Sequence, residues 1–217
     1  MLASLFLDTL RFIPDNAGLL LHKAAETAQL AFTALAIGLA IALPLGLWLG
    51  HRHRGLSLAL GVSSVGRALP SVALIGFGIA ILGVGFWNNT VALVVLAIPP
   101  LLTNSYFAVE GADRDAVEAA RGMGLTERQI LARVELPLGL PFILAGVQVA
   151  AVFVIATATL AGIFGGGGLG DIMANQVTYG LAGVLAAALC VSALALLTAA
   201  ALGIAQRAAY HRMAPRT

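Results

Sequence analysis

The sequence predicts an all-α integral membrane protein with about five transmembrane helices, and three observations lead to this prediction. Of the 217 residues, 60% are hydrophobic and 10% are charged, whereas soluble domains carry about 25% charged residues. The mean hydropathy is +0.97, which lies outside the range of soluble domains. The apolar residues also gather in runs of roughly the 20 residues that a helix needs to cross a bilayer.

The N-terminal stretch MLASLFLDTLRFIPD combines a short apolar patch with Asp8 and has no basic residue ahead of that patch. A cleaved signal peptide begins with positive charge, so this stretch does not fit one. We expect instead a short amphipathic segment that lies at the membrane surface.

Five apolar runs follow this segment. The first contains Pro44, the second contains Arg67 and Pro70, and the third contains Pro99 and Pro100. Two long stretches without charge supply the last two runs. The expected spans, in one transmembrane domain of residues 1–217, are about 28–49, 56–82, 90–109, 140–164 and 181–204. Six spans are the alternative, if the N-terminal patch also crosses or the second run is split.

The positions of the basic residues predict the orientation. Nine of the twelve lysines and arginines fall in the first loop, the long third loop and the C-terminal tail. Five spans place these three segments on one side of the membrane. Because loops rich in lysine and arginine stay in the cytoplasm, we expect the N-terminus outside and the C-terminus inside. The charged segment 110–137 is then a cytoplasmic loop.

This loop is predicted to contain two short helices. Asp115 can cap the first helix, with Glu118 completing a capping box. Gly122 and Gly124 are expected to end this helix, because glycine readily adopts the left-handed conformation of a helix C-terminus.

The second helix is expected to begin at Thr126, with Gln129 completing its capping box, and to stop at Pro137. Ala119, Ala120 and Gly122 leave one patch of the first helix nearly bare of side chains and open to close approach by another backbone. Physical reasoning alone leaves two interpretations of the loop: a solvated connector between two spans, or a docking surface.

A fixed spacing of residues in this loop resembles the EAA loop of bacterial ATP-binding cassette (ABC) importer permeases. That pattern is Glu-Ala-Ala, three residues, Gly, nine residues, Ile, one residue, Leu-Pro, and the chain departs from it only at Val134. In that family the loop is a coupling helix that sits in a cleft of the ATP-binding subunit. The resemblance therefore implies that six residues contact the ATPase: Glu118, Ala119, Ala120, Gly124, Leu136 and Pro137.

The stretches GRALPSVALIGFGI and ELPLGLPFILAGVQVAAVFVIATATLAGIFGGGGLGD extend the resemblance over most of residues 67–171. They are most similar to permeases for glycine betaine, choline and carnitine, and methionine or other amino-acid importers are the alternative. The resemblance implies a type I permease fold in the bacterial cytoplasmic (inner) membrane and transport by alternating access. It also implies three partners: two ATP-binding subunits that hold ATP and Mg, a second permease subunit, identical or not, and an extracytoplasmic substrate-binding protein.

Other classes of function find little support. The only lysine, Lys23, lies outside any Gly-Lys-Ser/Thr sequence, so the chain is not expected to bind ATP itself. No spacing of histidines predicts a metal site, and the small net charge of +2 gives no reason to expect nucleic acid.

The glycines of 165–170 fit GxGxxG outside a βαβ unit, so a tight turn or close packing is expected there. An ion-coupled transporter is the alternative from another class, although no expected span contains Asp or Glu.

Six residues within the spans are candidates for the solute path or its gate. Arg67, beside the bend at Pro70, could instead be a structural arginine, because a cation would repel a quaternary ammonium solute. For the polar residues, hydrogen bonds between helices are the alternative to solute contact. These polar candidates are Asn104, Gln148, Thr157 and Thr159.

Overall fold

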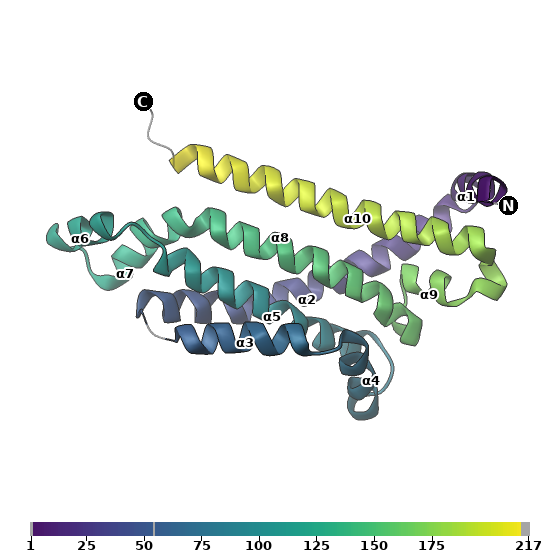
Figure 1. The fold of residues 1–217 in the computed structure, drawn as a ribbon, viewed down its shortest axis with the longest axis horizontal. Coiled ribbons are helices and arrows are strands. Elements are labelled where there is room, and N and C mark those ends of the chain that lie inside the picture. Colours follow the sequence, from purple (N-terminus) through teal and green to yellow (C-terminus); the bar gives the residue numbers. More distant parts are fainter. Residues whose placement is uncertain (1, 54, 214–217) are drawn as a thin grey trace. The chain divides into compact units, whose positions relative to one another are not determined.

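The computed structural model describes residues 2–53 and 55–213, without the side chains of Leu2, Ala3, Arg67, Arg212 and Met213. Every regular element within these residues is helical, which confirms the all-α prediction (Figure 1). The elements are α1 (Leu2–Asp15), α2 (Ala17–His51), α3 (Leu56–Ala68), α4 (Ser71–Leu82), α5 (Phe86–Glu110), α6 (Arg114–Gly122), α7 (Glu127–Ile130), the π-turn η1 (Leu131–Glu135), α8 (Leu136–Ala161), the π-turn η2 (Gly162–Gly166), α9 (Leu169–Ala174) and α10 (Gln176–Met213).

Four helical segments of the described chain are long and apolar enough to cross a membrane. They are Ala17–His51, Phe86–Glu110, Glu127–Gly166 and Gln176–His211. Four of the expected spans lie inside them. The remaining expected span, 56–82, corresponds to α3 and α4, which make a fifth crossing only if the two helices form one broken span.

The break between α3 and α4 falls where the sequence predicts it. Pro70 precedes the first residue of α4 with φ −67° and ψ 118°, an extended conformation. A proline disfavours helical geometry in the residue before it, so α3 ends ahead of Leu69. Arg67 lies near the end of α3, and its side chain is outside the described part of the chain.

The chain divides into two compact units. The first unit comprises Met1–Ala36, Leu69–Leu96 and Ala151–Thr198. The second unit comprises Ile37–Ala68, Ala97–Ala150 and Ala199–Thr217. Helices α2, α5, α8 and α10 contribute residues to both.

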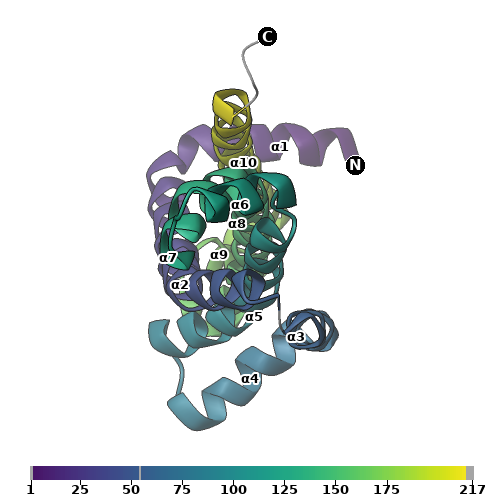
Figure 2. The same cartoon turned by 90° about the vertical axis from the view of Figure 1, so that its left-hand side faces the viewer.

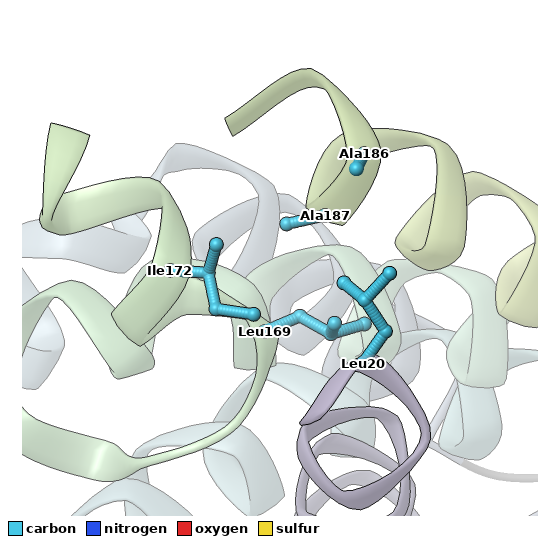
Figure 3. Packing of buried hydrophobic residues seen from close by; sticks show 5 residues of the cluster. All are labelled: Leu20, Leu169, Ile172, Ala186 and Ala187. Carbon is cyan, nitrogen blue, oxygen red and sulfur yellow. The ribbon is translucent and has the colours of Figure 1, made fainter. Parts of the chain in front are cut away.

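In the first unit, a cluster of apolar side chains holds α9 against α2 and α10 (Figure 3). Leu169 and Ile172 of α9 are fully buried, and Leu20 of α2 is 3% exposed. Ala186 and Ala187 of α10 complete the cluster, and their short side chains allow the helix to approach closely.

In the second unit, α5 packs closely against both α2 and α8, because glycines face it from each side. A Cβ atom on Gly50 of α2 would lie 2.6 Å from the carbonyl oxygen of Tyr106. A Cβ atom on Gly139 of α8 would lie 2.8 Å from the carbonyl carbon of Ala108. Only a residue without a side chain fits at these points.

Candidate functional site

Helices α6 and α7 lie side by side and form a hairpin of residues 114–130, called here the α6–α7 hairpin (Figures 1 and 2). The carboxylate of Asp113 caps α6 by accepting the backbone N–H of Asp115 at 3.0 Å. The expectation that Asp115 itself caps this helix is therefore wrong. With the cap two residues earlier, Glu118 is too far along the helix to complete a capping box, and its side chain is exposed.

The turn after α6 depends on Gly124. The N–H of Leu125 donates to the carbonyl of Ala120 at 3.2 Å, and the N–H of Gly124 donates to the carbonyl of Arg121 at 3.0 Å. These two bonds make a Schellman motif, in which the residue at the position of Gly124 must be left-handed. Its φ is +83°, as the sequence predicts for a terminating glycine, whereas Gly122 remains in the helix.

Helix α7 begins as expected, with Thr126 as its N-cap residue. The backbone N–H of Thr126 donates to Gln129 Oε1 at 2.8 Å. The prediction that Pro137 stops the helix is wrong, because helical structure continues from Glu127 into α8. The wide π-turn of Leu131–Glu135 ends two residues before this proline. The wider turn accommodates a residue that lacks an N–H and would clash within a regular helix.

Two hydrogen bonds join the two arms of the hairpin. Arg121 Nε and Nη2 donate to the two carboxylate oxygens of Glu127 at 3.1 and 3.2 Å. These bonds raise the pKa of the Arg121 guanidinium above its ordinary value. Both side chains are more than half exposed, so the pair orients the arms without adding much stability.

The EAA-like residues are divided between the surface and the interior. Glu118, Ala119, Gly124 and Pro137 are exposed, and Leu136 is half-buried. Ala120 is only 2% exposed. The expectation that Ala120 belongs to an open patch is therefore wrong, because this alanine faces the interior of its unit. Its small side chain lets α6 lie close to the structure beneath it.

A cavity of about 290 Å³ lies beside the hairpin, within the second unit. Its lining carries charges of both signs, so it can accept a polar or charged side chain. The charged and titratable residues of this lining are Glu110, Glu118, Glu135, His53, Arg114 and Arg121.

Next to the hairpin lies a pair of residues that no sequence motif indicates, His51 and Glu135. His51 Nδ1 is 2.6 Å from Glu135 Oε2, and only 3% of the Glu135 side chain is exposed. The other ring nitrogen of His51, Nε2, is 3.4 Å from Glu127 Oε2. His51 and Glu135 are 84 positions apart, and no spacing motif connects them.

The glycine-rich segment after α8 adopts the tight turn and close packing expected for it. Gly165, Gly167 and Gly168 have φ between +77° and +80°. A Cβ atom on Gly162 would lie 2.7 Å from the Cα of Gly170, so the backbone folds closely upon itself.

Polar side chains of helix α2 bind this turn, an arrangement that no sequence motif indicates. Glu26 accepts the N–H of Gly168 at 2.7 Å, and Thr27 accepts the N–H of Leu169 at 2.9 Å. Lys23 Nζ lies 2.7 Å from Asp171 Oδ2 and 3.0 Å from Glu26 Oε2. Only the opposite charges of Lys23 and Asp171 hint at this pairing in the sequence.

The polar candidates for the path use their hydrogen bonds within the chain. Gln148 Nε2 donates to the carbonyl of Ala199 on α10 at 3.0 Å, which confirms a bond between helices. For Asn104, Thr157 and Thr159 that expectation is wrong, because each donates to the carbonyl four residues earlier in its own helix, at 2.8, 2.9 and 3.2 Å. Short polar side chains in helices often bond in this way.

Comparison with known proteins adds to this geometry. Residues 42–212 match the family described as "Binding-protein-dependent transport system inner membrane component". The chain is 36% identical over 193 residues to the carnitine transport permease protein OpuCB of Listeria monocytogenes, with 88% of each chain covered. It is 34% identical over 198 residues to the choline transport system permease protein OpuBB of Bacillus subtilis, with 91% of each covered.

A solved structure shares the fold. A chain of the MetNI methionine ABC transporter, in an inward-facing conformation, superposes with a TM-score of 0.77. The match covers 90% of the present chain and 98% of that chain at 24% identity. At this identity the likeness concerns the fold alone.

Proposed function

The chain belongs to the family of inner membrane components of binding-protein-dependent transport systems, and on this premise we propose that it moves a quaternary ammonium osmoprotectant across the bacterial inner membrane. Membership in this family confirms the resemblance to ABC-importer permeases. The observation that carries the proposal of a solute is the pair of permeases for carnitine and choline, similar over about nine-tenths of the chain. Both solutes carry a quaternary ammonium group.

The proposed topology has five spans, with α3 and α4 forming one broken span of a single domain. The N-terminus lies outside and the C-terminus lies in the cytoplasm. The concentration of basic residues in the first loop, the third loop and the tail supports this orientation. Arg54 and Arg216 count toward it from the sequence alone, since they lie outside the described residues.

The α6–α7 hairpin is proposed to dock on the ATP-binding subunit. Its exposed residues Glu118, Ala119 and Gly124 would form the contact surface. Buried Ala120 would let α6 pack closely against the rest of its unit. Leu136 and Pro137, at the start of α8, would carry the motion into the spans. ATP and Mg belong to the partner subunit, whose hydrolysis cycle drives alternating access.

Two further partners complete the proposed importer. A second permease subunit forms the other half of the path, and an extracytoplasmic binding protein delivers the solute. The binding protein would supply most of the specificity, because an aromatic cage recognises a quaternary ammonium group well.

The candidate path residues are assigned structural roles in this proposal. Asn104, Gln148, Thr157 and Thr159 each donate a hydrogen bond to a backbone carbonyl of the chain, which supports a structural role for them. Pro70 makes the break in the second span. Arg67, on the same broken span, is assigned to stabilising that break.

Uptake by the reconstituted complex, with its ATP-binding and solute-binding proteins, tests the proposal. We expect labelled glycine betaine to accumulate only with ATP, and excess choline or carnitine to compete with it. Uptake driven by an ion gradient without ATP would contradict an ABC mechanism. Competition by methionine, without effect of choline and carnitine, would contradict the solute class and favour an amino-acid importer.

A further inference from the structure

We propose that His51 is a positioning residue that carries the movement of the α6–α7 hairpin to helix α2. This inference rests on the proposed function, because it concerns how the docked hairpin drives the spans. His51 is the last residue of α2, and both of its ring nitrogens face carboxylates that belong to the hairpin or follow it.

The first contact involves Glu135, whose carboxylate is almost completely buried. A buried carboxylate needs a hydrogen-bonding or charged partner, because an unpaired charge is strongly disfavoured away from water. His51 Nδ1, at 2.6 Å, supplies that partner. Glu135 is the last residue of η1, directly before α8. The contact therefore joins the end of α2 to the start of α8.

The second contact connects His51 to the hairpin itself. Its Nε2 lies 3.4 Å from Glu127 on α7, and Glu127 also accepts two hydrogen bonds from Arg121 on α6. Charged and polar contacts thus run without interruption from α6 through α7 and His51 to Glu135. These contacts give the hairpin a direct connection to the end of α2.

The neighbouring pair of His53 and Glu110 provides an internal comparison. His53 Nδ1 lies 2.8 Å from Glu110 Oε2, almost as close as the pair above. However, 56% of the His53 side chain and 29% of the Glu110 side chain are exposed. This pair connects the first loop to the end of α5 rather than to α7, so it lies outside the path from the hairpin to Glu135. His53 is therefore the matched control.

The experiment measures solute uptake and ATP hydrolysis by the same reconstituted complexes. We expect His51→Ala to retain the ATP-binding subunit and to hydrolyse ATP, while solute moved per ATP falls roughly 5-fold or more, a typical size for coupling between sites. His53→Ala should move as much solute per ATP hydrolysed as the unmodified complex. An unchanged ratio in His51→Ala, or an equal decrease of uptake and hydrolysis, would overturn the proposal.

A second variant protects the test against misfolding, since His51→Ala leaves Glu135 buried without its partner. His51→Gln keeps one side-chain donor for Glu135 and should restore part of the ratio. Combining His51→Ala with Glu135→Gln should be no worse than His51→Ala alone, because the two residues act as a pair. Additive losses in the double variant would overturn the proposal.

Failure of the proposed transport function and failure of the proposed role of His51 give different results. If the unmodified complex shows no ATP-driven uptake, the proposed function is wrong. If that complex transports and Glu118→Arg abolishes transport, while His51→Ala keeps its full ratio, only the role of His51 is wrong.

Discussion

The carboxylate of Glu26 on α2 accepts the backbone N–H of Gly168 at 2.7 Å, in the turn ahead of α9. Thr27 accepts the next N–H, that of Leu169, and Lys23 bridges to Asp171. Together with the apolar cluster around Leu169, these bonds attach the glycine-rich turn to the N-terminal part of α2. Because the turn lies so close to α2, its glycines should be sensitive to replacement.

Replacing Gly168 should be costly for two reasons. Its φ of +80° with ψ of −165° is a conformation that essentially only glycine adopts, so an L side chain costs about 1–3 kcal/mol, and a Cβ atom would collide with Thr27 Oγ1. We expect Gly168→Ala to lower the thermal unfolding temperature of the solubilised protein. Gly180→Ala is the matched control, because Gly180 has φ +64° and open space around it. Equal decreases in both variants would contradict the role of the Thr27 contact.

Gly124 and Gly122 should respond in opposite directions to the same substitution. At neither glycine would an added Cβ atom meet a neighbour within 4 Å, so only the backbone conformation differs. Gly124→Ala forces alanine to φ +83° and should destabilise the turn by about 1 kcal/mol. Gly122→Ala should be neutral or stabilising by up to about 1 kcal/mol, because alanine favours helix. Protease sensitivity of the hairpin measures the difference, and a reversed order would contradict the Schellman turn.

The contact of α2 with α5 predicts that Gly50 cannot become alanine without loss. The new Cβ would lie 2.6 Å from the carbonyl oxygen of Tyr106, and helix backbone moves only at a cost. Overpacking of this kind destabilises by about 1–3 kcal/mol. Gly61→Ala, on α3 with open space around the new Cβ, is the control that should be tolerated. The measurement is the thermal unfolding temperature of both variants. A Gly50→Ala variant as stable as the unmodified protein would show that α2 and α5 are farther apart.

Local features of the hairpin can be predicted from the sequence, because capping involves neighbouring residues. Thr126 with Gln129 and the left-handed Gly124 follow from residues within a few positions of each other. Asp113 competes with Asp115 as a cap, and the sequence pattern alone does not separate two aspartates so close together. The failure at Pro137 has a similar origin, since the π-turn that tolerates it has no sequence signal of its own.

Contacts between distant segments could not be predicted. Lys23 meets Asp171 across 148 positions, and His51 meets Glu135 across 84. Each of these residues is an ordinary charged or titratable side chain until the fold brings its partner near. Hydrophobic runs locate the helices well, but which helix faces lie together depends on close approaches such as Gly50 to Tyr106.

The proposed docking of the hairpin on the ATP-binding subunit can be tested at Glu118. Glu118 is exposed on α6, so its replacement should leave the fold of the permease intact. The measurement is ATP-driven glycine betaine uptake by complexes carrying Glu118→Arg, with Asp115→Arg on the same helix as the control. We predict that Glu118→Arg loses both uptake and the co-purifying ATP-binding subunit, while Asp115→Arg retains them. Full uptake and association in Glu118→Arg would contradict the account.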